Sequence, residues 1–268
     1  MAQPAQDFEC VLRTGCLFRA LAIAETRSTE RIKLTFSNRG IRWRGLSVCN
    51  TTMVNVHFLR DALERAPDDA DERVEIEVHC DSLCKVLQCL RITHADALHL
   101  RICAHNHTLQ LSVVRPEREA TMFLRCLQAP EKSPLPEDEA EWNWTYAVVV
   151  RVKGKAFHEM LKHVETVRNA VAFSVRQAAE RKHYLVAETP IAPELAYAKF
   201  ELSATLIQCE DGARCDATFN IERLLTITRG YECCPWITLH LDECRPLRIK
   251  WDMRPTAVKM SFLAPQCK

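Results

Sequence analysis

Fourteen cysteines and ten histidines are the residues of this chain that could bind a metal or act as nucleophiles. A zinc site usually places two cysteines close together as Cys-x-x-Cys, and this pattern does not occur in the sequence. The nearest approach to a ligand set is Cys103, His105 and His107, whose alternation would place them on one face of a strand. Alternating residues on an exposed strand are usually solvated, so we expect no metal at this position.

The sequence also lacks the surroundings of a catalytic centre. No family signature encloses a cysteine–histidine pair or a pair of carboxylates, so we expect no enzymatic activity and keep catalysis only as an alternative. The six glycines form neither G-x-G-x-x-G nor G-x-x-x-x-G-K-[ST], and we expect no cofactor. The first residues lack the apolar core of a signal peptide, so most cysteines should be reduced thiols that act as small apolar fillers.

Bulk charge and hydropathy do not point to a particular partner. Lys and Arg total 36 and Asp and Glu total 35, which gives a formal net charge of +1. Any contact with DNA must therefore come from local segregation of positive charge. No run approaches the roughly 18 consecutive apolar residues of a membrane span, so we expect no membrane partner.

Two kinds of periodicity identify the elements that would position a site. Seven segments alternate apolar and polar residues, which predicts strands with one buried face. Their apolar residues are Ile32, Leu34 and Phe36; Val74, Ile76 and Val78; Leu98, Leu100 and Ile102; Leu109, Leu111 and Val113; Ile237, Leu239 and Leu241; Leu247, Ile249 and Trp251; and Val258, Met260 and Phe262. Four other segments have helical stripes, formed by Leu17, Leu21 and Ala24; Leu83, Val86, Leu87 and Leu90; Phe157, Met160, Leu161 and Val164; and Ile221, Leu224, Leu225 and Thr228.

The order of these elements indicates a duplication. Helices are expected near residues 16 and 81, and again near 156 and 220, so the two pairs have almost the same spacing. We therefore predict an α+β fold of two tandem similar domains, each with two helices packed on antiparallel sheets. Residues 129–141 contain three prolines and five acidic residues, which predicts an extended connector. The expected boundaries are 1–128 for the N-terminal domain, 129–143 for the connector and 144–268 for the C-terminal domain.

This constellation resembles the sliding clamps of eukaryotes and archaea, the proliferating cell nuclear antigen family. The resemblance is clearest in three segments and covers nearly the whole chain. They are Gly15-Cys-Leu-Phe-Arg-Ala-Leu, Ser82-Leu-Cys-Lys-Val-Leu-Gln-Cys, and the stretch from Phe219 through Pro246-Leu-Arg-Ile to the final Phe262-Leu-Ala-Pro. The resemblance implies a DNA clamp fold, with the helices lining the hole of a three-subunit ring.

The function that this resemblance implies is that of a processivity factor in the nucleus. Its partners would be double-stranded DNA, DNA polymerase and other clients with a peptide motif, a clamp loader, and two further subunits in a homotrimer or a heterotrimer. A subunit of the heterotrimeric DNA-damage checkpoint clamp is one alternative, and a viral homologue would show the same features. A protein-only scaffold that kept the fold and lost DNA is another alternative.

Four basic residues are the expected contacts to DNA. The helical wheel places Arg19, Lys85 and Lys162 opposite the apolar stripes, and Arg229 follows the fourth helix. By resemblance, all four match positions where the family carries DNA-facing lysines or arginines. Gln88, Glu159 and Glu222 stand where the family often has a basic residue, so the inner surface should be less positive than is typical.

A partner peptide is expected to bind at an apolar pocket beneath the connector and not at the four basic residues. By resemblance, its apolar pocket is formed by Leu46, Leu135, Pro246, Ala264 and Pro265. An apolar pocket rimmed by the acidic connector would suit a peptide with aromatic and basic residues, unless the connector is a disordered linker with a stray leucine. The subunits of the ring should pair through edge strands, for which residues 109–114 and 196–202 are the candidates.

Overall fold

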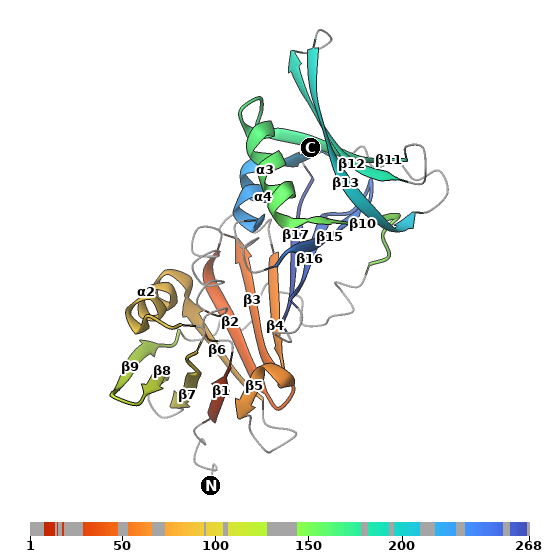
Figure 1. The fold of residues 1–268 in the computed structure, drawn as a ribbon. Coiled ribbons are helices and arrows are strands. Elements are labelled where there is room, and N and C mark those ends of the chain that lie inside the picture. The colour runs from red at the N-terminus through yellow and green to blue at the C-terminus, as the bar shows by residue number, and fades with distance from the viewer. Residues whose placement is uncertain are drawn as a thin grey trace. The chain divides into compact units, whose positions relative to one another are not determined.

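The structure is a computed structural model, and it divides the chain into two compact units. The first unit comprises Met1–Val48, Val54–Leu135 and Met253–Lys259, and the second comprises Cys49–Met53, Pro136–Asp252 and Met260–Lys268. The residues that the structure describes are 8–13, 15, 18, 29–47, 53–65, 73–93, 95–103, 107–127, 144–177, 182–192, 196–209, 218–228, 234–253 and 258–266. Figure 1 shows both units with their elements labelled.

The first unit contains two antiparallel groups of strands and one described α-helix. One group has the order β5 (Leu63–Arg65), β1 (Phe8–Leu12), β7 (Leu98–Cys103), β8 (Thr108–Arg115) and β9 (Arg118–Arg125). The other has the order β4 (Met53–Leu59), β3 (Gly40–Ser47), β2 (Thr29–Ser37) and β6 (Val74–His79). A short 3₁₀-helix, η1 (Arg60–Ala62), precedes β5, and α2 (Cys80–Leu90) follows β6 directly.

Alternation places one face of most of these strands in the core. Ile32, Leu34 and Phe36 of β2 are fully buried, because every second side chain points to the same side of the sheet. Phe18 packs on Trp43 and Phe58 with ring centroids 5.2 and 5.4 Å apart, which anchors the centre of this core. The apolar stripe of α2 contacts β2, β6 and β9, and the helix ends at Arg91, whose left-handed backbone (φ 49°) closes the last turn.

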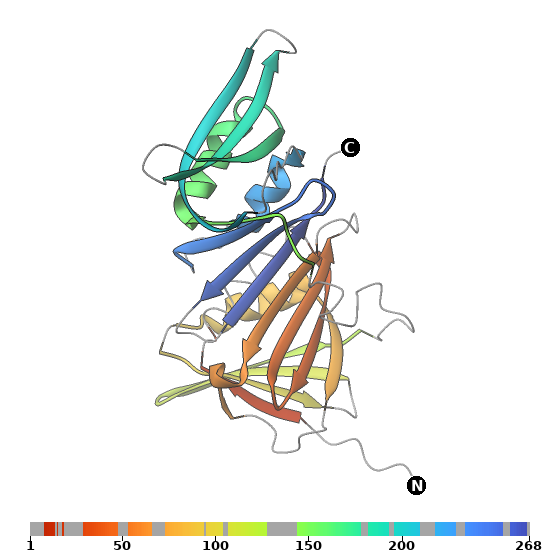
Figure 2. The same cartoon turned by 90° about the vertical axis from the view of Figure 1, so that its right-hand side faces the viewer.

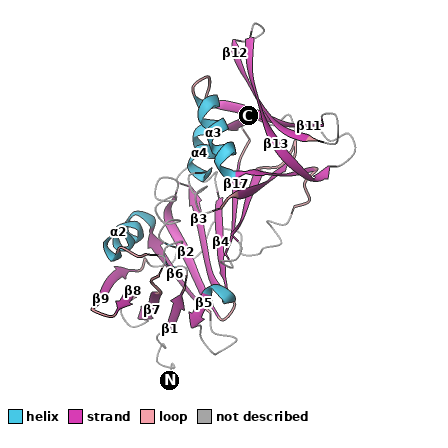
Figure 3. Ribbon diagram, in the orientation of Figure 1, coloured by secondary structure: helices cyan, strands magenta, loops and turns pink. Residues whose placement is uncertain are grey.

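The second unit repeats this plan with two described α-helices instead of one. Its order is β14 (Thr218–Asn220), β11 (Ala170–Gln177), β12 (His183–Ala192), β13 (Ala196–Cys209), β10 (Val148–Lys153), β15 (Trp236–Leu241), β16 (Leu247–Met253) and β17 (Val258–Ala264). Helix α3 (Gly154–Glu165) follows β10, and α4 (Ile221–Thr228) follows β14. The two helices contact each other, and α3 also contacts β10 and β13 (Figures 1 and 3).

The two units share one topology. The order β1, β7, β8, β9 in the first unit corresponds to β10, β15, β16, β17 in the second, and β6, β2, β3, β4 corresponds to β14, β11, β12, β13. In both units a helix is followed by a three-strand meander, α2 by β7–β9 and α4 by β15–β17. The predicted α+β class with two similar domains is therefore confirmed. The predicted first helix near residue 16 and the connector 129–143 lie outside the described residues, so the predicted boundaries remain predictions.

One of the two expected edge strands was wrong. Residues 109–114 lie in β8, which pairs with β7 on one side and β9 on the other, so they form no edge. The last strand of this group is β9, whose mixed sequence has no clean alternation. In the second unit, residues 196–204 of β13 pair with β12, and the described pairing with β10 begins only at Thr205, so residues 196–202 have a described partner strand on one side only, as expected for an edge. The long β12–β13 hairpin is visible in Figures 1 and 2.

Candidate nucleic-acid and peptide interfaces

Helix α2 presents one of the predicted DNA contacts to solvent. Leu83 and Leu87 are fully buried, while the Lys85 side chain on the opposite side is 72% exposed. Asp81 lies one turn earlier, and its carboxylate is 2.7 Å from the Lys85 ammonium. The hydrogen bond and the charge of Asp81 raise the pKa of Lys85. Asp81 also favours the start of the helix, because a negative charge there complements the helix dipole, but it offsets the positive charge that Lys85 would offer to DNA.

Helix α3 presents the second predicted contact in the same way. Phe157, Leu161 and Val164 are fully buried, and Lys162 is exposed on the opposite side of the helix. Among the described residues, Lys162 forms no ion pair. Lys155 at the first turn lies 3.9 Å from the Glu159 carboxylate, as the i,i+4 spacing predicts. The net positive charge of this helix surface therefore comes mainly from Lys162.

Helix α4 adds little positive charge in its described part. Its start is fixed by two asparagines: the Asn220 side-chain oxygen accepts from the Arg223 amide at 3.1 Å, and the Asn169 side-chain oxygen accepts from the Glu222 amide at 3.4 Å. His158 of α3 and Thr228 of α4 are both buried, with Nδ1 and Oγ1 2.8 Å apart, so a polar contact joins the two helices. Arg19 and Arg229 lie outside the described residues.

Three of the predicted pocket residues lie in the second unit, where side chains hold two segments together. The Gln266 side-chain amide donates to the carbonyls of Asp242, Glu243 and Arg245 at 3.1, 2.9 and 2.8 Å. This places the segment with Ala264 and Pro265 against the loop 242–246 that contains Pro246. Ala264 is buried, whereas Pro246 and Pro265 are half-buried and so remain accessible to a ligand.

A buried tyrosine fixes the other side of this loop. The Tyr146 hydroxyl donates to the Pro246 carbonyl at 3.1 Å, and Gln208 donates to the Tyr146 carbonyl at 3.1 Å. Burial is the main cause that raises the pKa of Tyr146 to about 12, so its hydroxyl keeps its proton and remains a donor. Neither Tyr146 nor Gln266 was among the predicted site residues, because a long-range bond from a side chain to a carbonyl leaves no periodic signal in the sequence.

The other two predicted pocket residues do not lie in the described part of the second unit. Leu46 is half-buried on β3 of the first unit, and Leu135 lies outside the described residues. The predicted pocket, as a set of five residues, remains a prediction.

The expected geometry of the candidate metal ligands was wrong. Cys103 is the last residue of β7 and is buried, whereas His107 lies in the turn before β8 with a left-handed backbone (φ 51°). The two residues therefore do not share a strand face, and His105 lies outside the described residues. Within the described part of the chain, no group of three or more side chains could hold a metal ion.

The nine described cysteines differ in burial. Five are buried, as expected for apolar fillers, and Cys126 is half-buried, but three are exposed: Cys89, Cys209 and Cys244. Burial raises the pKa of the Cys10 thiol to about 12 and that of Cys126 to about 11, so both stay protonated at neutral pH.

Searches with family models and against curated proteins gave no match to this sequence. Among solved structures, it is similar to the crystal structure of Proliferating Cellular Nuclear Antigen from Entamoeba histolytica. The TM-score is 0.79 at 12% sequence identity, and the match covers 97% of this chain and 99% of that chain. The chain has the fold of a sliding clamp. The resemblance inferred from the three sequence segments is thus confirmed for the fold, although the sequences have diverged far.

The clamp fold accounts for the placement of the described helices. Helices α2 and α4 follow β6 and β14, which are end strands, whereas α3 follows β10, which lies between β13 and β15. Lys85 of α2 and Lys162 of α3 are both exposed on the side of their helix that faces away from the core. None of the helices in the described part of the chain is both long and apolar enough to span a membrane.

Proposed function

We propose that this chain is a subunit of a ring-shaped sliding clamp that encircles duplex DNA and tethers polymerases and repair enzymes to it. The observation that carries the proposal is the clamp fold, which extends over 97% of the chain. In this role the protein is a processivity factor without catalysis of its own. It acts in the nucleus, and a clamp loader opens and closes the ring.

The helix surfaces support this assignment. Lys85 and Lys162 project from the sides of α2 and α3 that face away from the sheets, where a duplex in the hole would pass. Each lysine–phosphate contact contributes a salt-dependent increment to binding, and a closed ring needs few such contacts because its topology prevents dissociation. The low positive charge is compatible with sliding, since many tight contacts would slow it.

The sheet edges support assembly into a ring. Strand β9 is the last strand of its group, and residues 196–204 of β13 have a described partner strand on one side only. Phe123 of β9 and Tyr197 of β13 are 65% and 68% exposed. Backbone pairing between such edges in neighbouring subunits would cover the Phe123 and Tyr197 side chains and satisfy the unpaired backbone groups.

The decisive experiment combines solution mass with retention on DNA. A mass of about three times 30.7 kDa is expected for the homotrimer. After loading by a clamp loader with ATP, the protein should stay on nicked circular DNA in high salt and slide off once the circle is cut. A protein that remains monomeric, alone and with candidate partners, and that is lost equally from circular and linear DNA would refute the proposal.

The offset charges favour one second candidate, the checkpoint clamp. Asp81 and Glu159 lie beside Lys85 and Lys155, which reduces the positive charge of the inner surface. A chain that is monomeric alone and forms a ring only with two paralogous subunits would support this candidate. In either clamp, substitution of Arg19, Lys85, Lys162 and Arg229 with Ala should reduce loading and retention on circular DNA. A protein-only scaffold would assemble with its partners but would show no DNA retention for these substitutions to reduce.

A further inference from the structure

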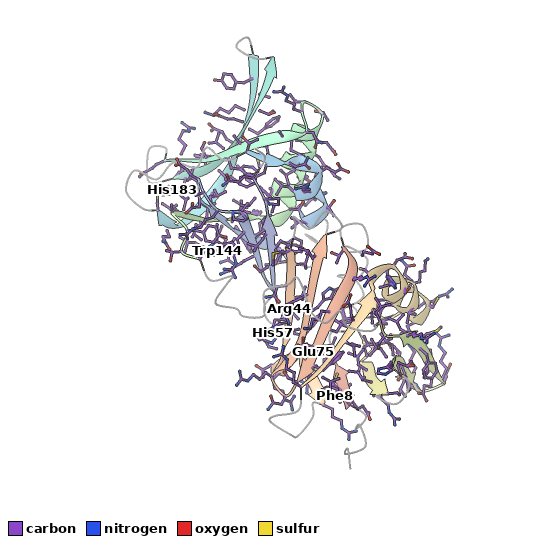
Figure 4. All side chains as sticks on the ribbon, turned by 180° about the vertical axis from the view of Figure 1, so that it is seen from behind. Phe8, Arg44, His57, Glu75, Trp144 and His183 are labelled. Atoms are coloured by element: carbon purple, nitrogen blue, oxygen red, sulfur yellow. The ribbon has the colours of Figure 1, made fainter. Side chains whose placement is uncertain are left out.

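Loop 242–246, between β15 and β16, is held by side chains from distant segments. The described pairing of β15 with β16 ends before this loop on both sides, so its backbone carbonyls lie beyond the ladder. The Gln266 side-chain amide donates to three of them, and the Tyr146 hydroxyl donates to a fourth, that of Pro246. Trp144, two residues before Tyr146 along the chain, is labelled in Figure 4. The conformation of the loop is therefore set from outside its own hairpin.

The surroundings of Gln266 Nε2 contain more acceptors than the amide has protons. Nε2 lies 3.1, 2.9 and 2.8 Å from the carbonyl oxygens of Asp242, Glu243 and Arg245. A side-chain amide carries two N–H groups, so the three carbonyls share two protons. An oxygen atom at the same position would be repelled by all three carbonyls, which fixes the orientation of the amide. The position therefore selects a side chain that donates.

Gln266 is itself anchored to the core of the second unit. Its backbone forms an isolated β-bridge with Phe219 of β14, whose ring is fully buried and stacks on the Phe173 ring. The next residue, Asn220, caps the start of α4 through its side-chain oxygen. The side chain of Gln266 therefore ties the loop to a strand that is fixed by the aromatic core and by the helix that follows it.

The corresponding segment of the first unit is held by main-chain bonds. Leu127 follows β9 as Gln266 follows β17, and it forms the corresponding bridge with Glu77 of β6. The Leu127 amide donates to the Glu77 carbonyl at 2.7 Å, and the Cys126 amide donates to the His107 carbonyl, in the turn before β8, at 2.8 Å. In the second unit a side chain joins the segment to the corresponding loop. That connection therefore depends on which residue occupies position 266.

Two accessible prolines lie next to these hydrogen bonds. Pro246 follows Arg245 and Pro265 precedes Gln266, and both prolines are half-buried. A proline ring fixes its own φ angle, so the position of each ring follows from the backbone beside it. Because the Gln266 amide joins the two backbone segments, it sets the position of one ring relative to the other. A ligand that contacts both prolines would meet a surface that is already formed.

We propose that Gln266 is a positioning residue, which keeps loop 242–246 in the conformation in which Pro246 and Pro265 receive the peptide of a client protein. The inference rests on client binding as a part of the proposed function. Gln266 acts through the carbonyls of the loop and not through contact with the peptide. A loop that is ordered before binding loses less conformational freedom on binding. The affinity therefore depends on the fraction of molecules whose loop has the competent conformation.

The test measures peptide binding to variants of the full chain. The probe is a fluorescein-labelled alanine-rich peptide with two adjacent phenylalanines and several lysines, and its control has alanine in place of both phenylalanines. Gln266→Ala removes the donor, whereas Gln266→Lys supplies an ammonium group with three N–H groups, one for each carbonyl. Gln177→Ala, at an exposed glutamine of the same unit, is the matched control. If Gln266→Ala loses its circular-dichroism spectrum, Gln266→Met replaces it, because methionine keeps the length of the side chain and donates nothing.

Stopped-flow fluorescence gives the association and dissociation rates, and hydrogen exchange measured by mass spectrometry gives the protection of loop 242–246. Gln266→Ala should lower the affinity about tenfold or more through a slower association, since only the fraction of competent loops changes. Hydrogen exchange in the loop should become faster in this variant. Gln266→Lys should keep the affinity within about threefold of that of the unchanged chain, and Gln177→Ala should alter neither measurement.

The proposal is overturned if the unchanged chain binds the phenylalanine peptide no more tightly than the alanine peptide, or if Gln266→Ala binds it as the unchanged chain does. It is also overturned if the weaker binding lies in the dissociation rate alone, or if Gln266→Lys binds as weakly as Gln266→Ala. Retention on circular DNA is measured separately on the unchanged chain. Peptide binding that follows these expectations without such retention would refute the clamp function and leave the role of Gln266 intact.

Discussion

Removal of the Phe173 ring should destabilise the second unit strongly. Phe173 is fully buried between Phe157 of α3 and Phe219 of β14, with ring centroids 5.8 and 5.9 Å away. Truncation of a buried phenylalanine to alanine typically costs about 3–5 kcal/mol, because the transfer term is lost and a cavity remains. Each aromatic pair contributes about 0.5–1.5 kcal/mol beyond its buried area. Phe173→Leu retains most of the volume but loses both pairs, so it should cost about 1–3 kcal/mol.

Urea unfolding followed by circular dichroism measures these differences in the free energy of unfolding. The matched control is Ile207→Ala in the same unit, since Ile207 is 58% exposed and its truncation should change stability by less than about 0.5 kcal/mol. The order of destabilisation should be Phe173→Ala, then Phe173→Leu, then the control, with the slope of the transition unchanged. If Phe173→Ala cost no more than the control, the three rings would not form the core contact that holds α3 in place.

Three further predictions concern charge and pH. Lys162→Ala should reduce DNA binding and reduce the magnitude of the slope of log K against log salt concentration by about 0.9 per lost phosphate contact. Lys155→Ala should have a smaller effect, because the Glu159 carboxylate already offsets that charge. Fluorescence anisotropy over a salt series measures both slopes, and equal slopes for the two variants would contradict this prediction. Burial beside two cations lowers the folded-state pKa of His240 to about 3. As pH falls below 6.5, the unfolded chain binds a proton at this residue and the folded chain does not, so the free energy of unfolding should fall by up to about 1.4 kcal/mol per pH unit. His240→Gln should remove this part of the pH dependence in urea titrations. The hydrogen bond from Arg115 is the main cause that lowers the pKa of Asp96. The ionised carboxylate therefore stabilises the fold at neutral pH, and this stabilisation is lost as pH falls below the ordinary aspartate pKa. Asp96→Asn should lower the free energy of unfolding at pH 7 and reduce its loss in acid, and an unchanged acid profile would contradict the role of this pair.

Periodicity predicted the parts of the fold where one face is buried. The strands with Ile32, Leu34 and Phe36, or with Ile237, Leu239 and Leu241, could be recognised because burial on one side forces every second residue to be apolar. The helix stripes of α2, α3 and α4 were correct for the same reason. Strand β9, however, has only one buried residue, Leu124, so its sequence gives no alternation, and the edge of its group was assigned to β8 instead.

The candidate site was only partly predictable. Lys85 and Lys162 could be placed opposite the apolar stripes because helix geometry fixes that relation. The bonds of Gln266 and Tyr146 to distant carbonyls could not be predicted, since they depend on which segments meet in space.

The exposed thiol of Cys89 offers a native attachment point on a functionally informative surface. It lies four residues after Lys85, one turn further along α2, while Cys10 is buried and stays protonated. A maleimide dye should therefore react at Cys89 in preference to the buried cysteines, and substitution of Cys209, Cys244 and the five cysteines outside the described residues would make the labelling site-specific. A fluorophore at this position would test the proposed passage of a duplex beside α2 through a change in its emission, without any engineered residue on that surface.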